Sequence, residues 1–461
     1  MDLRADIVVI GGGLSGATAA LRAASLGREV VLVRKGYGAT AIGSGTFDVL
    51  GGSPCENLGL LTGERFDSAH ELLSLAKRLP LHPYGLLADV HGGHAEEAWS
   101  TFQRRFEAAS SFLLDRLAKA GHGFAGRLDA ITAHTTTQGT FRWTNLAPLS
   151  VHRADVAAFE DARVVFVGIE GVGAFDASFV GRSLTALLRD ERPRAIDLVD
   201  FRTLRIPWAR ATGGLLPAEV ARDLDNLERR EEFAEELTRA ISGGRFSHAI
   251  VAPCLGIASH PETLDLLSQR TGLNVSEPLV GPPHAIHGLR IQKALDRALS
   301  TSSVRVVGAQ VTGAETTHSV VNALRGEGEE GAIRVRAERF VLASGRYVGG
   351  GLRGRGTLQE AIFDLPVFHH GRSVNDRPVF SLLRPGFRTR QPAFDAGLRA
   401  SADLRPLRED GRVAFGNLYA CGTILGGYDL ALDGTGPGVN LLTGFAAGEI
   451  AAGSEGKGSE A

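Results

Sequence analysis

The chain has 461 residues, of which 43% are hydrophobic and 22% are charged. This is ordinary globular composition, which excludes a mainly disordered chain and, at about 150 residues per domain, favours about two to three domains. Lys and Arg number 50 against 52 Asp and Glu, so the formal net charge is −2. A chain so close to neutral offers no basis for non-specific nucleic-acid binding, and we expect no nucleic-acid partner.

The cysteines and the apolar runs indicate an intracellular protein. The three cysteines, Cys55, Cys254 and Cys421, lie far apart, which excludes a disulfide framework and the paired spacing of zinc or thioredoxin-like sites. The first residues include acids where a secretory signal would be basic, and the apolar run at 7–10 is too short for such a signal. No stretch of about 18 apolar residues is present. We therefore expect a cytoplasmic chain without a transmembrane segment.

The first 35 residues predict a βαβ unit. Residues 6–10 read as a buried parallel strand, 17–26 as a helix and 30–33 as a second strand, with a glycine turn between the first two. Gly11, Gly13 and Gly16 complete the G-x-G-x-x-G pattern, in which glycines allow a tight turn and the helix N-terminus faces a phosphate. We predict that a nucleotide or flavin phosphate binds here, held by Gly11, Gly13, Leu14, Ser15 and Gly16.

The second strand ends differently from most such units. The acidic residue that binds an adenosine ribose is replaced by Arg34 and Lys35. Two interpretations remain open. Either an adenylate half is held in another way, or a mononucleotide places its single phosphate at the glycine turn with Arg34 nearby. A solvated charge at the strand end is the simpler alternative for Arg34.

A second glycine-rich segment follows at 38–52. It contains Ser44, Gly45 and Thr46, small residues that suit a planar ring lying against backbone. We count these three among the expected cofactor-binding residues, with a surface loop as the alternative.

The middle of the chain mixes helices and strands. Helical patterns cover 95–119 and 218–241, and short strands are expected at 163–167, 195–199 and 248–251. We expect an α/β capping or substrate domain over residues 61–284. It would be inserted into a discontinuous, Rossmann-like flavin-binding domain formed by residues 1–60 and 285–461.

The last third predicts a β-meander and a return to the cofactor. Short strands at 304–307, 318–324 and 333–335 precede a buried strand at 339–345 that ends in Ser344 and Gly345. A further strand leads to Gly422 and Thr423, and a final helix starts at Gly436, Pro437, Gly438 and Val439. The N-terminal dipole of that helix would stabilise negative charge on a reduced flavin, so these residues join the expected cofactor site and the chemistry is expected to be redox.

Together these motifs resemble the family of B-type subunits of anaerobic glycerol-3-phosphate dehydrogenase, within the fumarate reductase-like flavoproteins. The resemblance is carried by the βαβ unit, the loop at 45–50, His-Pro-Tyr at 82–84, residues 344–345 with 349–352, and residues 417–429, which end in Gly-Gly-Tyr-Asp. It spans nearly the whole chain.

The resemblance implies a flavoprotein subunit in a three-subunit complex that is peripheral on the inner membrane. The complex oxidises glycerol 3-phosphate to dihydroxyacetone phosphate and passes electrons through an iron–sulfur subunit to quinone in anaerobic respiration. The family is assigned FMN, whereas the glycine motif by itself favours FAD. Three scattered cysteines cannot supply four cluster ligands, so any iron–sulfur cluster is expected on a partner, and no metal site is expected here.

Two other functions stay open. One is a stand-alone fumarate reductase-like enzyme acting on another small substrate, and the other is a non-catalytic subunit that relays electrons or organises the assembly while the catalytic subunit oxidises the substrate. For catalysis on this chain, Arg142 is the first candidate for holding the substrate phosphate, with Thr140 beside it and Arg346 as a further cation. His82 and His134 are nominal candidates for the base.

Overall fold

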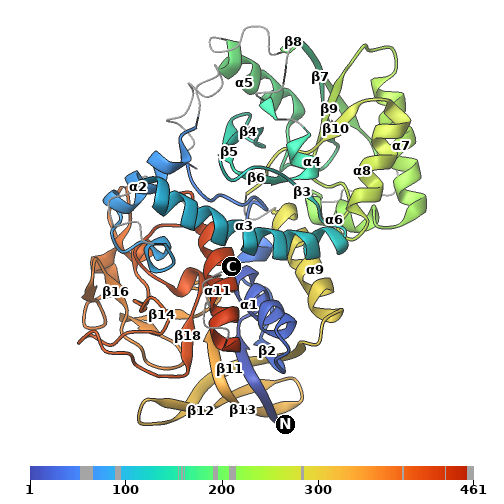
Figure 1. Ribbon diagram of the computed structural model, residues 1–461. Coiled ribbons are helices and arrows are strands. Elements are labelled where there is room, and N and C mark those ends of the chain that lie inside the picture. Colours follow the sequence, from blue (N-terminus) through green and yellow to red (C-terminus); the bar gives the residue numbers. More distant parts are fainter. Residues whose placement is uncertain are drawn as a thin grey trace, which may run out of the picture. The chain divides into compact units, whose positions relative to one another are not determined.

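The computed structural model describes residues 1–51, 66–88, 95–153, 155–156, 159, 161–189, 196–206, 214–281, 285–386, 389–430 and 432–453. The chain divides into two compact units (Figure 1). The first unit comprises Met1–Thr40, Ser68–Arg116 and Leu295–Ala461, and the second comprises Ala41–Asp67 and Leu117–Ala294. Each has its own apolar core.

A parallel sheet forms the centre of the first unit. Its order is β11 (Arg305–Thr317), β2 (Val30–Arg34), β1 (Asp2–Ile10), β13 (Gly331–Leu342) and β18 (Leu418–Ala420). Residues 7–10 of β1 are fully buried and apolar, as a strand between two parallel neighbours requires. The carboxyl ends of β1, β13 and β18 are level, because Ile10 pairs with Leu342 and Leu342 pairs with Ala420.

Two helices pack closely together beside this sheet. α1 (Leu14–Ser25) follows β1 directly, and α11 (Gly436–Ala452) ends the described chain (Figure 1). Side chains at Gly444 and Gly448 would place their Cβ atoms 2.5 and 2.6 Å from the carbonyl oxygens of Ser15 and Ala19. Glycine at these positions therefore lets the two helix backbones approach, which holds the two N-termini in one region of the unit.

The expected meander is present, with longer strands than the sequence indicated. β12 (Val320–Gly328) runs antiparallel to both β11 and β13. The strands predicted at 333–335 and 339–345 are one continuous strand, β13, because residues 331–336 pair with β12 while residues 334–342 pair with β1. This strand carries the chain from the meander to Ser344.

Shorter elements complete the first unit. They are η1 (Ala39–Ile42, whose last two residues fall in the second unit), α2 (Ser68–Arg78), η3 (Pro83–Leu86), β14 (Leu352–Arg355), β15 (Thr357–Glu360), β16 (Phe368–His369), β17 (Arg372–Ser373), η5 (Val379–Leu382), α10 (Pro392–Asp395) and η6 (Gly422–Ile424).

The second unit is built on a four-stranded parallel sheet of order β10-β9-β7-β8. The strands are β7 (Ala162–Ile169), β8 (Ile196–Leu204), β9 (His248–Val251) and β10 (Asn274–Ser276), and the connecting helices are α5 (Ala177–Arg189), α6 (Pro217–Asp223), α7 (Leu227–Ile241) and α8 (His260–Thr271). Two small hairpin-like pairs accompany it, β3 (Phe124–Gly126) with β6 (Leu146–Pro148) and β4 (Thr132–Thr135) with β5 (Phe141–Thr144), followed by α4 (Leu149–His152). Two helices, α3 (Ala95–Lys119) and α9 (Ile286–Ser300), continue from one unit into the other.

The units differ from the expected domain limits. Residues 68–116, assigned to the capping domain from sequence, group with the first unit, and residues 41–51, assigned to the flavin domain, group with the second. The helix expected over 218–241 is two helices, α6 and α7, since the side chain of Asn226 accepts N–H bonds from Glu228 and Arg229 and starts a new helix. Among the residues discussed from sequence, Cys55 lies outside the described residues.

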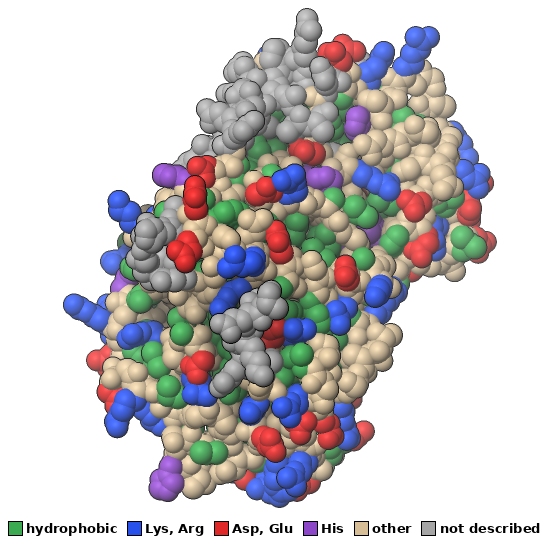
Figure 2. Space-filling view, viewed as in Figure 1, with side chains coloured by type: hydrophobic (Ala, Val, Ile, Leu, Met, Phe, Trp, Pro, Cys, Tyr) green, Lys and Arg blue, Asp and Glu red, His purple; other side chains and the backbone are tan. Residues whose placement is uncertain are grey.

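No described helix is both long and apolar enough to cross a membrane. Figure 2 shows basic and acidic side chains interspersed on the face displayed, as expected for a chain with a net charge of −2.

Candidate functional site

The first glycine turn has no room for side chains. Gly11 has φ +107°, and a Cβ there would lie 2.3 Å from the carbonyl oxygen of Ala343. A Cβ at Gly16 would lie 1.9 Å from the carbonyl oxygen of Gly11. The two glycines therefore allow β1 to turn directly into α1 while β13 passes alongside.

The N-terminus of α1 is open to an anion. Its first turn holds no acidic residue, and the N-cap residue, Gly13, has no side chain that could cap the helix. The Leu14 N–H donates to the Thr40 hydroxyl at 2.9 Å, but the N–H groups of Ser15 and Gly16 have no acceptor among the described residues. Free N–H groups at the positive end of a helix form a phosphate-binding site.

Two further predicted segments reach the same edge of the sheet. Ser344 and Gly345 follow β13, and Gly422 and Thr423 follow β18. Gly422 has φ +77° and donates its N–H to the Thr443 hydroxyl at 2.8 Å, which ties this loop to α11. The Ser344 hydroxyl is buried without a hydrogen-bond partner in the described part of the chain. An unpaired buried hydroxyl is costly, so this position favours a polar ligand.

The first N–H groups of α11 also lack hydrogen-bond acceptors among the described residues. Its first intrahelical bond joins the Val439 N–H to the Thr435 carbonyl, and Pro437 has no N–H. The N–H groups of Gly436 and Gly438 are buried and have no acceptor in the described segments. The structure thus brings the predicted residues around 11–16, 344–345, 422–423 and 436–439 into one unit, with two helix N-termini and three strand ends.

Arg34 and Lys35 are placed differently. Arg34 forms an ion pair with Asp296 at 2.6 Å, and its Cδ occupies the space that a side chain on Gly12 would need. Lys35 is exposed. Arg34 therefore packs on the glycine turn with its charge balanced by Asp296 of this chain.

The remaining predicted cofactor residues belong to the second unit. Gly45 has φ +80° and packs against His287, while the hydroxyls of Ser44 and Thr46 lie 2.8 Å apart. The Thr46 hydroxyl donates to Asp48 at 2.9 Å. In this unit, these residues serve to hold the loop and its buried carboxylate.

The first catalytic candidate, Arg142, is paired with that carboxylate. Its guanidinium forms an ion pair with Asp48, whose side chain is 2% exposed, and the charge of Asp48 raises the pKa of Arg142. The Arg142 Nε is buried without a hydrogen-bond partner among the described residues. Thr140 is exposed in the turn between β4 and β5, where its hydroxyl lies 2.8 Å from that of Thr136.

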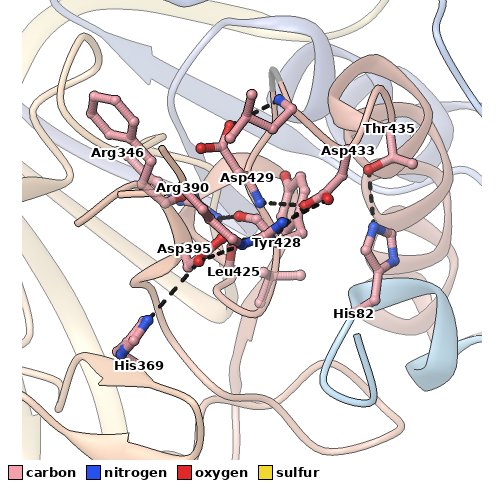
Figure 3. A network of polar contacts seen from close by, with 12 residues as sticks. His82, Arg346, His369, Arg390, Asp395, Leu425, Tyr428, Asp429, Asp433 and Thr435 are labelled. Carbon is pink, nitrogen blue, oxygen red and sulfur yellow. Dashed lines mark hydrogen bonds and ion pairs between the residues drawn. The ribbon is translucent and has the colours of Figure 1, made fainter. Parts of the chain in front are cut away.

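Arg346, the second candidate cation, binds backbone carbonyl groups. It donates to the carbonyl oxygens of Phe394, Leu425 and Tyr428, and it lies over the Tyr428 ring at 4.9 Å (Figure 3). This arrangement fixes the Gly-Gly-Tyr-Asp loop against α10. The Tyr428 hydroxyl is buried with no partner in the described part of the chain, and burial raises its pKa to about 12.

Sequence reasoning missed the ionic network beside this loop. Arg390 bridges two buried carboxylates, Asp395 and Asp433, each at 2.7 Å (Figure 3). His369 and His370 lie close enough to Asp395 for the three to be a candidate metal group. Both oxygens of Asp395 already accept from Arg390, so the arrangement favours an ion pair over a metal. Asp395 is five residues from Arg390, but Asp433 is 43 residues away, so the sequence does not show that one arginine joins both carboxylates.

The two histidines proposed as bases are both buried and neutral. Burial lowers the pKa of His82 to about 3 and that of His134 to about 3. His82 contacts Thr435 and Tyr84, and His134 contacts Thr132. Neither ring is therefore poised to take a proton near neutral pH.

A second buried network lies in the second unit. Burial alone would raise the pKa of Glu277, but the charges of Arg290 and His260 outweigh it and lower that pKa. Arg290 donates to both carboxylate oxygens of Glu277, at 2.6 and 3.0 Å. The pair is fully satisfied, which indicates a structural role.

The first unit fits a flavin nucleotide. Its glycine turn, the two open helix N-termini and the unpaired Ser344 hydroxyl together offer buried donors to an anionic, acceptor-rich ligand. Cys254 and Cys421 are buried, and burial raises the pKa of each thiol.

Curated relatives cover nearly the whole chain. The B-type subunit of anaerobic glycerol-3-phosphate dehydrogenase of Vibrio cholerae is 28% identical over 96% of this chain and 95% of its own. A probable B-type subunit of anaerobic glycerol-3-phosphate dehydrogenase of Halobacterium salinarum is 30% identical over 98% of this chain and 99% of its own.

Among solved structures, 3-ketosteroid delta1-dehydrogenase from Sterolibacterium denitrificans matches 98% of this chain and 100% of its own at 13% identity, with a TM-score of 0.43. The family described as "FAD binding domain" matches residues 6–439. This match supports FAD, and the FMN that the resemblance implied has no support from it. The chain therefore belongs to the FAD binding domain family, with an α/β flavoprotein fold, and within it to the family of B-type subunits of anaerobic glycerol-3-phosphate dehydrogenase.

Proposed function

We propose that this chain is the FAD-binding subunit of an anaerobic glycerol-3-phosphate dehydrogenase, acting in the oxidation of glycerol 3-phosphate to dihydroxyacetone phosphate. One observation carries the proposal. Unsatisfied donors at two helix N-termini and at the Ser344 hydroxyl lie in one unit of a chain whose curated relatives bear this name over nearly their full length.

The residues proposed to hold FAD lie in four segments of the first unit. The N–H groups of Ser15 and Gly16 would bind pyrophosphate at the start of α1, with Gly11, Gly13 and Leu14 shaping the turn. Ser344, Gly345, Gly422 and Thr423 would line the cofactor at the strand ends. Gly436, Pro437, Gly438 and Val439 would place the positive end of α11 against the ring. Bound FAD would supply hydride acceptance, and the chain would supply its orientation and charge.

Electrons then need a partner. The sequence has three cysteines, fewer than the four thiolates of a typical iron–sulfur cluster. The relatives are named as one subunit of an assembly. We propose that an iron–sulfur subunit receives the electrons for quinone, that a catalytic subunit joins the same complex, and that the complex is peripheral on the inner membrane.

One observation favours a second candidate, electron relay without substrate chemistry on this chain. Both cations predicted to hold the substrate phosphate are otherwise engaged, Arg142 by Asp48 and Arg346 by three carbonyl oxygens. In that case the catalytic subunit would oxidise glycerol 3-phosphate, and this chain would carry its electrons.

The decisive experiment is anaerobic reduction of the flavin in the purified chain. Bleaching of the flavin spectrum by glycerol 3-phosphate with the chain alone would support catalysis here. Bleaching only after the catalytic subunit is added would support relay. A flavin that glycerol 3-phosphate never reduces, with or without partners, would contradict both and return attention to a stand-alone enzyme with another substrate.

A further inference from the structure

His82 is buried in the first unit, and each of its two ring nitrogens has a hydrogen-bond partner. The residue is 3% exposed, and its ring lies against those of Tyr84 and Tyr428 at centroid distances of 4.5 and 5.1 Å. The Tyr84 N–H donates to Nδ1 at 3.2 Å, and Nε2 lies 2.9 Å from the Thr435 hydroxyl oxygen (Figure 3).

These contacts fix the position of the ring proton. A backbone N–H can only donate, so Nδ1 must accept and carries no hydrogen. Burial keeps the ring neutral, with a pKa of about 3, and the single hydrogen of the neutral ring is therefore on Nε2. Nε2–H donates to the Thr435 oxygen, and the Thr435 hydroxyl hydrogen must point elsewhere.

Thr435 does not use its side chain as helix caps usually do. It is the residue before α11, yet its hydroxyl caps none of the helix N–H groups. It is 1% exposed, and no acceptor for its hydrogen exists among the described residues. With the N–H groups of Gly436 and Gly438, three buried donors at one helix end lack an acceptor in the described part of the chain. Such a set requires an oxygen-bearing ligand.

We propose that His82 is a positioning residue of the flavin site: its Nε2–H holds the Thr435 hydroxyl so that this hydroxyl donates to the flavin at the N-terminus of α11. The inference rests on the proposed FAD site. Donors at this end stabilise the added negative charge of the reduced ring more than they stabilise the oxidised ring. Removing one should lower the ratio of reduced to oxidised affinity by about tenfold, since a hydrogen bond to a charged group contributes about 1.5 kcal/mol or more.

The test is a cycle of variants read by the midpoint potential of the bound FAD. His82→Asn keeps an oxygen where Nδ1 accepts from Tyr84 but is too short to reach Thr435, so the local turn is preserved while the link is cut. Thr435→Val removes the hydroxyl at constant shape, and Thr435→Ser retains it. A tenfold change corresponds to about 30 mV for a two-electron couple.

We expect His82→Asn and Thr435→Val each to lower the potential by about that amount, the double variant to fall no further than Thr435→Val, and Thr435→Ser to match the wild-type chain. Unchanged potentials in the single variants, or additive shifts in the double variant, with FAD bound at wild-type stoichiometry, would overturn this inference alone. A wild-type chain that holds no flavin would overturn the proposed function together with it. Loss of FAD from His82→Asn but not from Thr435→Val would show a structural role for His82 and also overturn the inference.

Discussion

Replacing Gly16 by alanine should damage both the fold and the flavin site. Its Cβ would lie 1.9 Å from the Gly11 carbonyl oxygen and 3.2 Å from the Ala343 Cβ. Ordinary contact needs about 3.5 Å, so the turn and α1 would have to separate by roughly 1.5 Å. Gly11 cannot yield easily, because its N–H donates to Val33 at 2.9 Å and its Cα faces β13.

The sign of the change in unfolding free energy shows whether overpacking outweighs helix propensity at this position. Alanine inside a helix is ordinarily about 1 kcal/mol better than glycine, whereas overpacking of this kind costs about 1–3 kcal/mol or more. We expect a net loss of about 2 kcal/mol in unfolding free energy and at least a tenfold weaker affinity for FAD, since the N–H groups of Ser15 and Gly16 move with the helix.

Denaturant unfolding and titration of the apoprotein with FAD, followed by flavin fluorescence, measure the two effects. Gly308→Ala is the matched control, because a Cβ there meets no atom within 4 Å. A Gly16→Ala chain as stable as the control, with wild-type FAD affinity, would refute the reasoning.

Three further outcomes follow from the charges. Arg142→Met should destabilise the second unit by about 3 kcal/mol in denaturant unfolding, because it leaves the Asp48 carboxylate buried without its ion-pair partner. Adding Asp48→Asn should restore most of that loss. Equal stability of the single and double variants would contradict this prediction. His134 is neutral in the folded state, with a pKa of about 3, so below pH 6.5 the unfolded state binds more protons and the unfolding free energy falls as the pH drops. Between pH 6.5 and 5 the wild-type chain should lose about 2 kcal/mol more unfolding free energy than His134→Gln. Equal losses in the two chains would count against this prediction. Arg34→Gln should leave FAD affinity within about threefold, because the Arg34 charge is balanced by Asp296, and a tenfold loss would show that Arg34 contacts the cofactor.

The elements that could be predicted from the sequence are those formed by contiguous residues. The βαβ unit could be predicted because strand, turn and helix are contiguous, and the glycine spacing at 11–16 reports a steric need that holds in the fold. A buried strand that begins near 339 and leads to Ser344, and the glycine loop after Ala420, were predicted for the same reason, although the strand ends at Leu342 and not at Gly345. The break before α7 was missed although Asn226 is a recognisable helix cap.

The pairing of the arginines could not be predicted. Arg142 meets Asp48 across 94 residues of sequence, and Arg346 reaches carbonyl oxygens 48 to 82 residues away. A pattern of residue types shows that a cation is present, but only the fold shows whether its donors are already used. His82 and Thr435, 353 residues apart, are joined in the same way.

The compact units also differ from the expected domain limits for a physical reason. α3 is one uninterrupted helix, Ala95–Lys119, and the contacts of its first part place it with the first unit. Phe112 packs on Phe445 of α11 at a centroid distance of 5.4 Å. Helical periodicity reports that a helix has an apolar side but does not say which core receives it.

The most direct test of the central claim is to identify the cofactor. The purified chain is denatured, and the released small molecule is identified by chromatography and mass and counted against protein. We expect FAD at about one per chain, lost in Gly16→Ala and retained in Gly308→Ala. FMN in its place, or no flavin after reconstitution with FAD, would contradict it.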